Sequence, residues 1–263
     1  MQLIDIGANL THESFRRDLA AVLERAHKVG VEKMIVTGAS RAGSEHALEL
    51  AREHPGVLYA TAGVHPHHAG DYGSVTDALL RTLAIEPEVL AVGETGLDYF
   101  RDLSPRPAQR AAFEKQLAIA ADLQMPLFLH QRDAHDDFLA LLKTARDLVP
   151  AVVVHCFTDD KRALFDYLDL DCHIGITGWI CDERRGVHLR ELVREIPADR
   201  LLLETDAPYL LPRDIRPQPP DRRNEPMHLA HICEAVARER GEAAEVTAAN
   251  ATAASRAFFG LPA

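Results

Sequence analysis

The sequence is poor in cysteine and contains no long apolar segment, and each absence excludes a class of protein. Its four cysteines, Cys156, Cys172, Cys181 and Cys233, form no CxxC pair. This argues against a disulfide scaffold and predicts reduced, mostly buried thiols in the cytoplasm. No run approaches the roughly 20 apolar residues of a membrane-spanning helix. The first residues lack the basic and apolar regions of a signal peptide, so we expect a cytoplasmic protein without membrane contact.

Basic residues are also in the minority, with 29 Lys and Arg against 40 Asp and Glu and a formal net charge of −11 when histidine is neutral. This balance argues against sequence-independent coating of nucleic acid, which needs many cations to displace counterions. It does not exclude a nuclease, because metal ions and a few local arginines can offset the charge of a phosphate. The motifs GxGxxG, GxxxxGK[ST] and GxSxG are missing, which argues against dinucleotide-binding, P-loop and serine-hydrolase sites.

What the chain does contain is a regular alternation of short apolar runs with amphipathic helical stretches. The predicted strands are Leu3–Gly7, Lys33–Thr37, Val57–Gly63, Val89–Val92, Pro126–His130, Ala151–His155, Cys172–Thr177 and Arg200–Glu204. Helices are predicted between them, among them Ser14–Val29 and Arg184–Glu195, and twice more after the last one, and no linker interrupts the series. The pattern predicts an α/β protein with a (β/α)8 TIM barrel that forms one domain over residues 1–263. The rival is a doubly wound open sheet, which the missing nucleotide motifs disfavour.

Several predicted strands end in a histidine or a carboxylate. These residues are Glu94, His130, His155, Glu204 and Asp206. Polar side chains at the carboxyl ends of barrel strands are where such folds build their sites. Imidazoles and carboxylates together suit a divalent cation. We therefore predict one metal site, assembled from segments that are distant in the sequence.

The position of each residue suggests its role in that site. His130 and His155 are expected to be neutral ligands, and Glu94 a ligand able to bridge two metals. Asp206 is expected to contact the metal and to act as the general base, since a cation lowers the pKa of coordinated water toward neutrality. His65 either donates to an anionic substrate oxygen or orders its loop. Asp98 either hydrogen-bonds a ligand or caps a turn.

Other residues of these loops are interpreted more simply. His67 and His68, which follow His65, are expected to face solvent. Arginines gather after the fifth and seventh predicted strands and in the Pro-rich loop 210–224. In a protein of this acidity they resemble a local phosphate-binding rim. The candidates are Arg132, Arg184, Arg185, Arg213, Arg216, Arg222 and Arg223, with the aromatic residues Tyr99, Trp179 and Tyr209 available to stack on a base or to pack the loops.

Over nearly its whole length the sequence resembles the TatD-type hydrolases, a metal-dependent family. The resemblance rests on eight segments in order: GANLT (Gly7–Thr11), TAGVHPH (Thr61–His67), VGETGLDY (Val92–Tyr99), LHQRDAHDDF (Leu129–Phe138), VVHCFT (Val153–Thr158), IGITGWICDERRG (Ile174–Gly186), LLLETDAPYLLPRD (Leu201–Asp214) and RRNEP (Arg222–Pro226). It implies a (β/α)8 hydrolase that acts on DNA phosphodiesters. The details of these segments indicate the branch of Mg²⁺-dependent 3′-to-5′ exonucleases of single-stranded DNA and RNA, which is associated with repair of oxidative damage.

Residue by residue, the resemblance implies that Glu94, His130 and His155 are metal ligands and that Asp206 completes the site. His65 corresponds to the end-of-strand histidine of the family. Mn²⁺ and Zn²⁺ are alternatives to Mg²⁺ as the cofactor. We expect a monomer that binds single-stranded DNA or RNA.

The chain departs from the family at the end of its first strand. Most members carry HxH there as ligands of a second metal, but this sequence has Asn9 and Thr11. An amide and a hydroxyl are weaker ligands than imidazoles. We therefore predict one firm metal and a second Mg²⁺ that is held loosely or recruited with substrate.

Two other functions stay open. A barrel hydrolase of a C–N, ester or lactone bond could use the same ligands, although it would more often show HxH and a metal-bridging lysine. No lysine lies at a predicted strand end. A nucleic-acid-binding protein without catalysis would retain DNA but show no EDTA-sensitive turnover.

Overall fold

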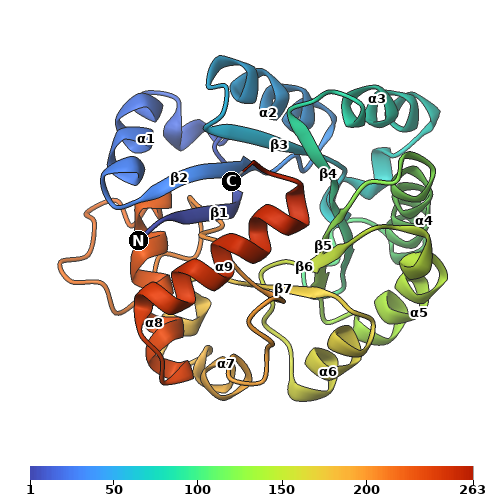
Figure 1. The fold of residues 1–263 in the computed structure, drawn as a ribbon. Helices are drawn as coiled ribbons and strands as arrows, with labels where there is room; N and C mark the ends of the chain where they lie inside the picture. The colour runs from blue at the N-terminus through green and yellow to red at the C-terminus, as the bar shows by residue number, and fades with distance from the viewer. Residues whose placement is uncertain (263) are drawn as a thin grey trace. The chain divides into compact units, whose positions relative to one another are not determined.

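The computed structural model describes residues 1–262, in which strands and helices alternate along the chain (Figure 1). The strands are β1 (Leu3–Ala8), β2 (Val31–Val36), β3 (Leu58–Ala62), β4 (Val89–Asp98), β5 (Leu127–Arg132), β6 (Val152–Val154), β7 (His173–Ile176) and β8 (Leu201–Leu203). They form one sheet in the order β1-β2-β3-β4-β5-β6-β7-β8. Parallel strands in sequential order, each followed by a helix, define the (β/α)8 barrel, and that prediction is confirmed.

The α-helices are α1 (Leu19–Lys28), α2 (Arg41–Glu53), α3 (Ser74–Ala84), α4 (Arg106–Leu123), α5 (His135–Ala145), α6 (Lys161–Asp169), α7 (Val187–Leu192), α8 (Leu229–Arg240) and α9 (Ala244–Phe259). Short 3-10 helices are η1 (Glu13–Phe15), η2 (Pro66–Asp71), η3 (Arg146–Leu148), η4 (Gly178–Cys181) and η5 (Pro226–His228). Within residues 1–262, no helix combines the length and the apolar character that crossing a bilayer requires.

Two predicted helices are shorter than expected. The stretch predicted as a helix over 14–29 forms η1 and a turn before α1 begins at Leu19. In the stretch predicted as a helix over 184–195, the backbone N–H groups of Arg184 and Arg185 donate to Oδ1 of Asp182, at 2.9 and 3.1 Å. This turn delays the start of α7 to Val187. In the first of these stretches the backbone N–H of Ser14 donates to Nδ1 of His12 at 3.1 Å. In both places a local side-chain partner thus competes with the helical hydrogen bonds.

The contacts group the described chain into two compact units. Unit 1 comprises Met1–Val36, Cys156–Asp160 and the chain from Ile174 onward, and unit 2 comprises Thr37–His155 and Lys161–His173. The expectation of a single domain over 1–263 stays a prediction.

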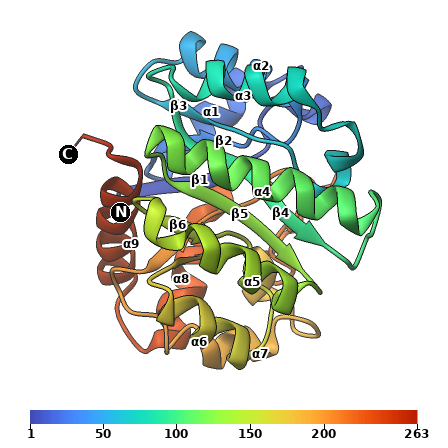
Figure 2. The same cartoon turned by 90° about the vertical axis from the view of Figure 1, so that its right-hand side faces the viewer.

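Unit 2 contains β3 to β6 and the helices α2 to α6, with α4 and α5 packed against β4 and β5 (Figure 2). Strand β4 is longer than predicted, because it continues beyond Val92 to Asp98. Gly93 and Gly96 make this possible, with φ angles of +144° and +146°. A Cβ at Gly96 would lie 1.8 Å from the backbone oxygen of His130. Only glycine allows this approach of β4 to β5.

The longer strand changes the position of Glu94, which was predicted to follow the end of its strand. Glu94 lies inside β4 and is buried. Since successive strand residues point to opposite faces, Glu94 and Asp98 share one face of β4. The sheet therefore presents both carboxylates from the same strand.

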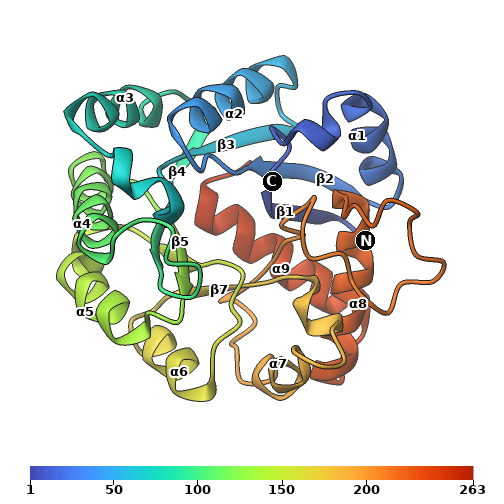
Figure 3. The same cartoon turned by 180° about the vertical axis from the view of Figure 1, so that it is seen from behind.

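Unit 1 brings the first and last strands together. Asp206 N–H donates to Gly7 O at 2.8 Å, and Asn9 N–H donates to Ala207 O at 2.7 Å. Helix α9 packs against both β1 and β8. The loop between β8 and η5 extends from this unit and is orange in Figure 3.

Asp5 of β1 is a fully buried carboxylate in unit 1. Its Oδ1 accepts hydrogen bonds from the backbone N–H groups of Thr205 and Gly7, and the Thr205 hydroxyl donates to Oδ2 at 2.5 Å. Burial is the dominant influence and raises the pKa of Asp5 from 3.8 to about 7, although the Thr205 and Gly7 hydrogen bonds oppose it. The folded chain therefore holds a proton near neutral pH that the unfolded chain releases.

This carboxyl gives a prediction for stability. Between pH 4 and pH 7 the folded state binds more protons than the unfolded state, so Asp5 makes the free energy of unfolding fall as pH rises, by at most about 1.4 kcal/mol per pH unit. Asp5→Asn keeps the accepting oxygen and should remove this slope, as measured by urea denaturation across that range. Asp147→Asn, at an exposed carboxylate of η3, should retain it. Equal slopes in both variants would contradict the assignment.

Candidate active site

Glu94 lies at the centre of a cluster of histidines in unit 2. Its Oε1 is 2.8 Å from Nε2 of His155, 3.2 Å from Nδ1 of His130 and 3.4 Å from Nε2 of His65. The carboxylate comes from β4 and His130 from β5, whereas His155 follows β6 and His65 follows β3. Four consecutive strands of the sheet thus bring one carboxylate and three imidazoles together.

The electrostatics of the cluster favour the ionised form of the Glu94 carboxylate. Burial alone would raise the pKa of Glu94, but the charges of His65 and His155 and hydrogen bonds from His130 and His155 hold it well below its usual range. Burial lowers the pKa of His65 from 6.5 to about 3, against the attraction of Glu94. His65 is therefore neutral at physiological pH.

Asp98 adds a second carboxylate beside His130. Its Oδ2 lies 2.9 Å from Nε2 of His67 and 3.3 Å from Nε2 of His130, and Oδ1 accepts the N–H of Arg101 at 2.7 Å. Burial opposes ionisation, but these hydrogen bonds together outweigh it and hold the pKa of Asp98 far below 3.8. Asp98 thus closes a turn and bonds His67 and His130, and whether it supports a metal ligand through His130 stays a prediction.

The expectation that His67 faces solvent is wrong. Its side chain is only 29% exposed, because Nε2 of the ring is bonded to Oδ2 of Asp98 at 2.9 Å instead of to water. His68 is exposed, as predicted.

One hydrogen bond decides the tautomer of His65. Its Nδ1 accepts the backbone N–H of His67 at 3.1 Å, so the proton of the neutral ring lies on Nε2. This nitrogen is the one that faces Glu94. His65 therefore orders its loop through Nδ1 and presents an N–H donor through Nε2.

Two glutamines of α4, missed by the sequence interpretation, fix the backbone of the site. Gln116 accepts the N–H of Val64 at 2.7 Å and donates to Val64 O at 3.1 Å. Gln109 accepts the N–H of Asp98 at 2.9 Å and donates to Ser104 O at 2.8 Å. Both are buried. The available signal was two amides seven residues apart on the apolar face of a predicted helix.

The donor set fits a divalent cation. Ligand atoms of His65, Glu94 and His130 lie within 4.8 Å of one another, as do those of His65, His67 and Asp98. His155 also reaches Glu94. Imidazole suits Zn²⁺ and related transition-metal ions, and carboxylate oxygen suits Mg²⁺ and Mn²⁺.

The predicted site residues Asn9, Thr11 and Asp206 lie in unit 1. Asp206 has a left-handed φ of 54°, and its Oδ1 accepts the side-chain N–H of Asn9 at 2.9 Å. Thr11 lies two residues beyond Asn9, in the turn before η1. The two residues that replace HxH thus follow β1, and one of them holds the carboxylate of Asp206.

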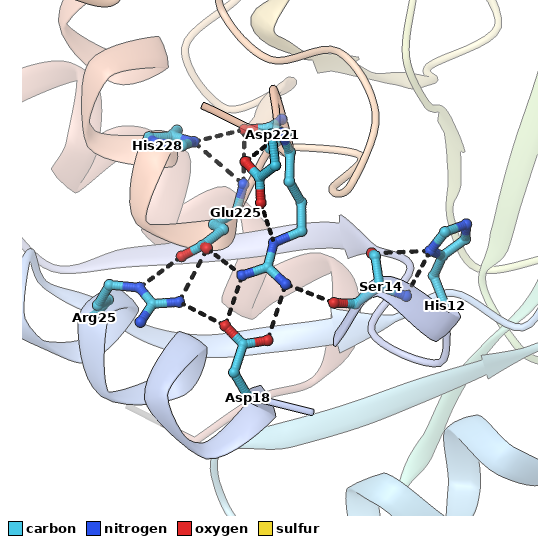
Figure 4. A network of polar contacts seen from close by, with 9 residues as sticks. His12, Ser14, Asp18, Arg25, Asp221, Glu225 and His228 are labelled. Carbon is cyan, nitrogen blue, oxygen red and sulfur yellow. Dashed lines mark hydrogen bonds and ion pairs between the residues drawn. The ribbon is translucent and has the colours of Figure 1, made fainter. Parts of the chain in front are cut away.

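Arg223 lies in a dense ion network around Asp18, Arg25 and Glu225 (Figure 4). Its guanidinium is 2.7 Å from both Asp18 Oδ2 and Glu225 Oε1, and it donates to Ser14 O at 2.6 Å. Hydrogen bonds from Arg223, despite some burial, hold the pKa of Asp18 below 3.8. The network ties the end of loop 210–224 to the start of α1.

The other arginines of the predicted phosphate-binding rim differ in their exposure and in their contacts. Arg184 and Arg222 are exposed. Arg213 lies 3.7 Å from Asp182 Oδ2, and Arg132 stacks 3.8 Å from the centre of the Phe100 ring.

Comparisons with known proteins agree on the family. The model for TatD related DNase matches residues 4–260. The 3′-5′ ssDNA/RNA exonuclease TatD of Erwinia billingiae is 52% identical over 261 residues, which cover 99% of this chain and 100% of that protein. The protein of the same name from Klebsiella pneumoniae is 51% identical, with 98% of each chain covered.

Among solved structures, the TatD homolog YJJV from Escherichia coli matches with a TM-score of 0.90 and 30% identity, over 99% of this chain and 98% of that one. A TatD family hydrolase from Entamoeba histolytica matches with a TM-score of 0.88 at 24% identity, over 100% of this chain and 99% of the other, which supports the fold alone. Unit 2 thus has residues that could hold a metal ion, and the chain belongs to the TatD-related DNase family, whose members are metal-dependent.

Proposed function

We propose that this chain is a metal-dependent 3′-to-5′ exonuclease that hydrolyses phosphodiester bonds of single-stranded DNA and RNA. Relatives about half identical to it over their full length carry that name. The structural observation that supports the proposal most is the buried Glu94 carboxylate, whose Oε1 lies within 3.4 Å of nitrogens of three histidines. A role in repair of oxidative damage stays an expectation from the resemblance.

Glu94, His130 and His155 would hold the cation in unit 2. When bound, a divalent ion supplies Lewis-acid stabilisation of a phosphate and lowers the pKa of water. Asp98 lies 3.3 Å from Nε2 of His130 and can accept its proton, so Nδ1, which faces Glu94, would be the nitrogen that ligates a bound cation in place of its hydrogen bond to Glu94. Mg²⁺ is the ion we expect, with Mn²⁺ and Zn²⁺ as alternatives.

His65 has a different part in this proposal. Its proton is on Nε2, so that nitrogen cannot also ligate a metal while the ring is neutral. The N–H instead donates to an anionic oxygen, here Glu94 and, in the reaction, a non-bridging phosphate oxygen.

The residues of unit 1 enter the proposal through the family resemblance. Asp206 takes a proton as the general base, and the Asn9 amide fixes the orientation of its carboxylate. Asn9 and Thr11 offer only weak ligands for a second ion.

We keep Arg132, Arg184, Arg213 and Arg222 as substrate-phosphate contacts. Arg223 is bonded to two carboxylates and a carbonyl, so we assign it to anchoring the loop that carries the others.

The test of the reaction is a digest of 3′-labelled and 5′-labelled single-stranded oligonucleotides with Mg²⁺, Mn²⁺ or Zn²⁺. We expect EDTA-sensitive release of nucleotides from the 3′ end. Glu94→Gln should lower kcat/KM by about 100-fold or more, since even partners behind a ligand matter 10- to 100-fold. The exposed Glu53→Gln on α2 should have no effect. Full activity of the Glu94 variant would place the active centre elsewhere.

Gln116→Leu tests whether α4 positions His65. The change leaves the buried N–H and C=O of Val64 without their side-chain partner, which costs about 1–3 kcal/mol for each group. We expect the variant to unfold at lower urea concentration, and kcat to fall while KM changes little. Glu114→Gln, on the exposed face of α4, should match the parent protein in both measurements. A destabilised variant with unchanged kcat would show that Gln116 serves stability alone.

A further inference from the structure

A second group of possible ligand atoms lies in unit 1 and contains none of the residues of the proposed exonuclease site. Its members are Cys181, Asp214 and His231, with one ligand atom of each within 4.8 Å of the other two. Cys181 ends η4, Asp214 lies in the loop after β8, and His231 is on α8. Three separate elements thus converge on one point.

The contacts inside the group are close and its exposure is graded. Nε2 of His231 lies 2.7 Å from Oδ1 of Asp214. Cys181 is 2% exposed, whereas the side chains of Asp214 and His231 are 40% and 31% exposed. The sulfur of Cys181 is therefore buried, and the carboxylate of Asp214 and the ring of His231 are accessible to an ion from solvent.

We propose that Cys181, Asp214 and His231 bind one thiophilic divalent cation of the Zn²⁺ class. A thiolate, an imidazole and a carboxylate are the three ligand types that Zn²⁺ takes in proteins, and a water can complete its tetrahedron. The sulfur selects against Mg²⁺, which prefers oxygen ligands in an octahedron. The cation would join η4, the loop and α8, elements that are far apart in the chain.

The same residues do not form a nucleophilic triad. In such a triad the histidine lies between the nucleophile and the acid, whereas here the carboxylate of Asp214 lies between them and is bonded to both Cys181 and His231. Burial, with a smaller contribution from Asp214, raises the pKa of Cys181 to about 12, which is the reverse of an activated thiol. When the Sγ–metal bond forms, the thiol proton leaves to solvent, so that charge and atoms balance.

The experiment titrates the full chain, freed of metal by chelation, with Co²⁺ and records absorption. A thiolate ligand gives a sulfur-to-cobalt charge-transfer band in the near ultraviolet, which the oxygen and nitrogen donors of the Glu94 cluster cannot give. We expect one Co²⁺ per chain to produce this band, Zn²⁺ to abolish it by displacement, and Mg²⁺ to leave it unchanged. Cys181→Ser should eliminate the band. Asp214→Asn and His231→Gln should each weaken the affinity about 10-fold or more, since loss of a supporting partner alone costs that much.

Cys233→Ser is the matched control, because Cys233 is a second buried thiol of unit 1, on α8. It should keep the band. Far-ultraviolet circular dichroism verifies folding, and Cys181→Ala replaces the serine variant if that one fails to fold. No band in the parent protein, or a band that survives loss of Cys181, would overturn the proposal. Glu94→Gln should lose exonuclease activity and keep the band, which separates this site from the proposed function.

Discussion

The constraint on which the site of unit 2 depends is the burial of one carboxylate among three imidazoles. A buried charge without partners would be prohibitively costly, and Glu94 is 7% exposed. His155, His130 and His65 make it tolerable by placing nitrogens within 3.4 Å of a single oxygen. The same groups also suit a cation, because a metal ion can replace the protons that His130 and His155 share with Glu94.

The surrounding structure serves to hold these four side chains in place. Glycine at 93 and 96 lets β4 lie close to β5, so that Glu94 and Asp98 approach His130 from one strand. The amides of Gln109 and Gln116 then fix the backbone at Asp98 and Val64 from the helix side. Asp98, which bonds His130, and Val64, which precedes His65, are thus held from α4, and metal sites generally have outer support of this kind.

Much of this was available in the sequence, for identifiable reasons. The apolar runs that end in His130 and His155 predict strands, and they also predict candidate ligands at the strand ends, because the carboxyl ends of parallel strands meet on one side of the sheet. The length of β4 was not available, since glycines ordinarily end strands and here they permit a close approach. The inward position of His67 and the bonds of Arg223 depend on partners 31 and 205 residues away, which local patterns cannot reveal.

The ion network of Asp18, Arg25, Arg223 and Glu225 joins segments about two hundred residues apart, and unit 1 as a whole is built from both ends of the chain, whereas unit 2 is nearly continuous. A chain emerging from the ribosome makes its amino-terminal part first. Residues 1–36 therefore cannot complete unit 1 until the last third of the chain, which carries the charged partners of α1, has been synthesised. Unit 2 has all of its strands long before that moment. During synthesis, the order in which the two units become complete is therefore the reverse of the order in which the chain begins them.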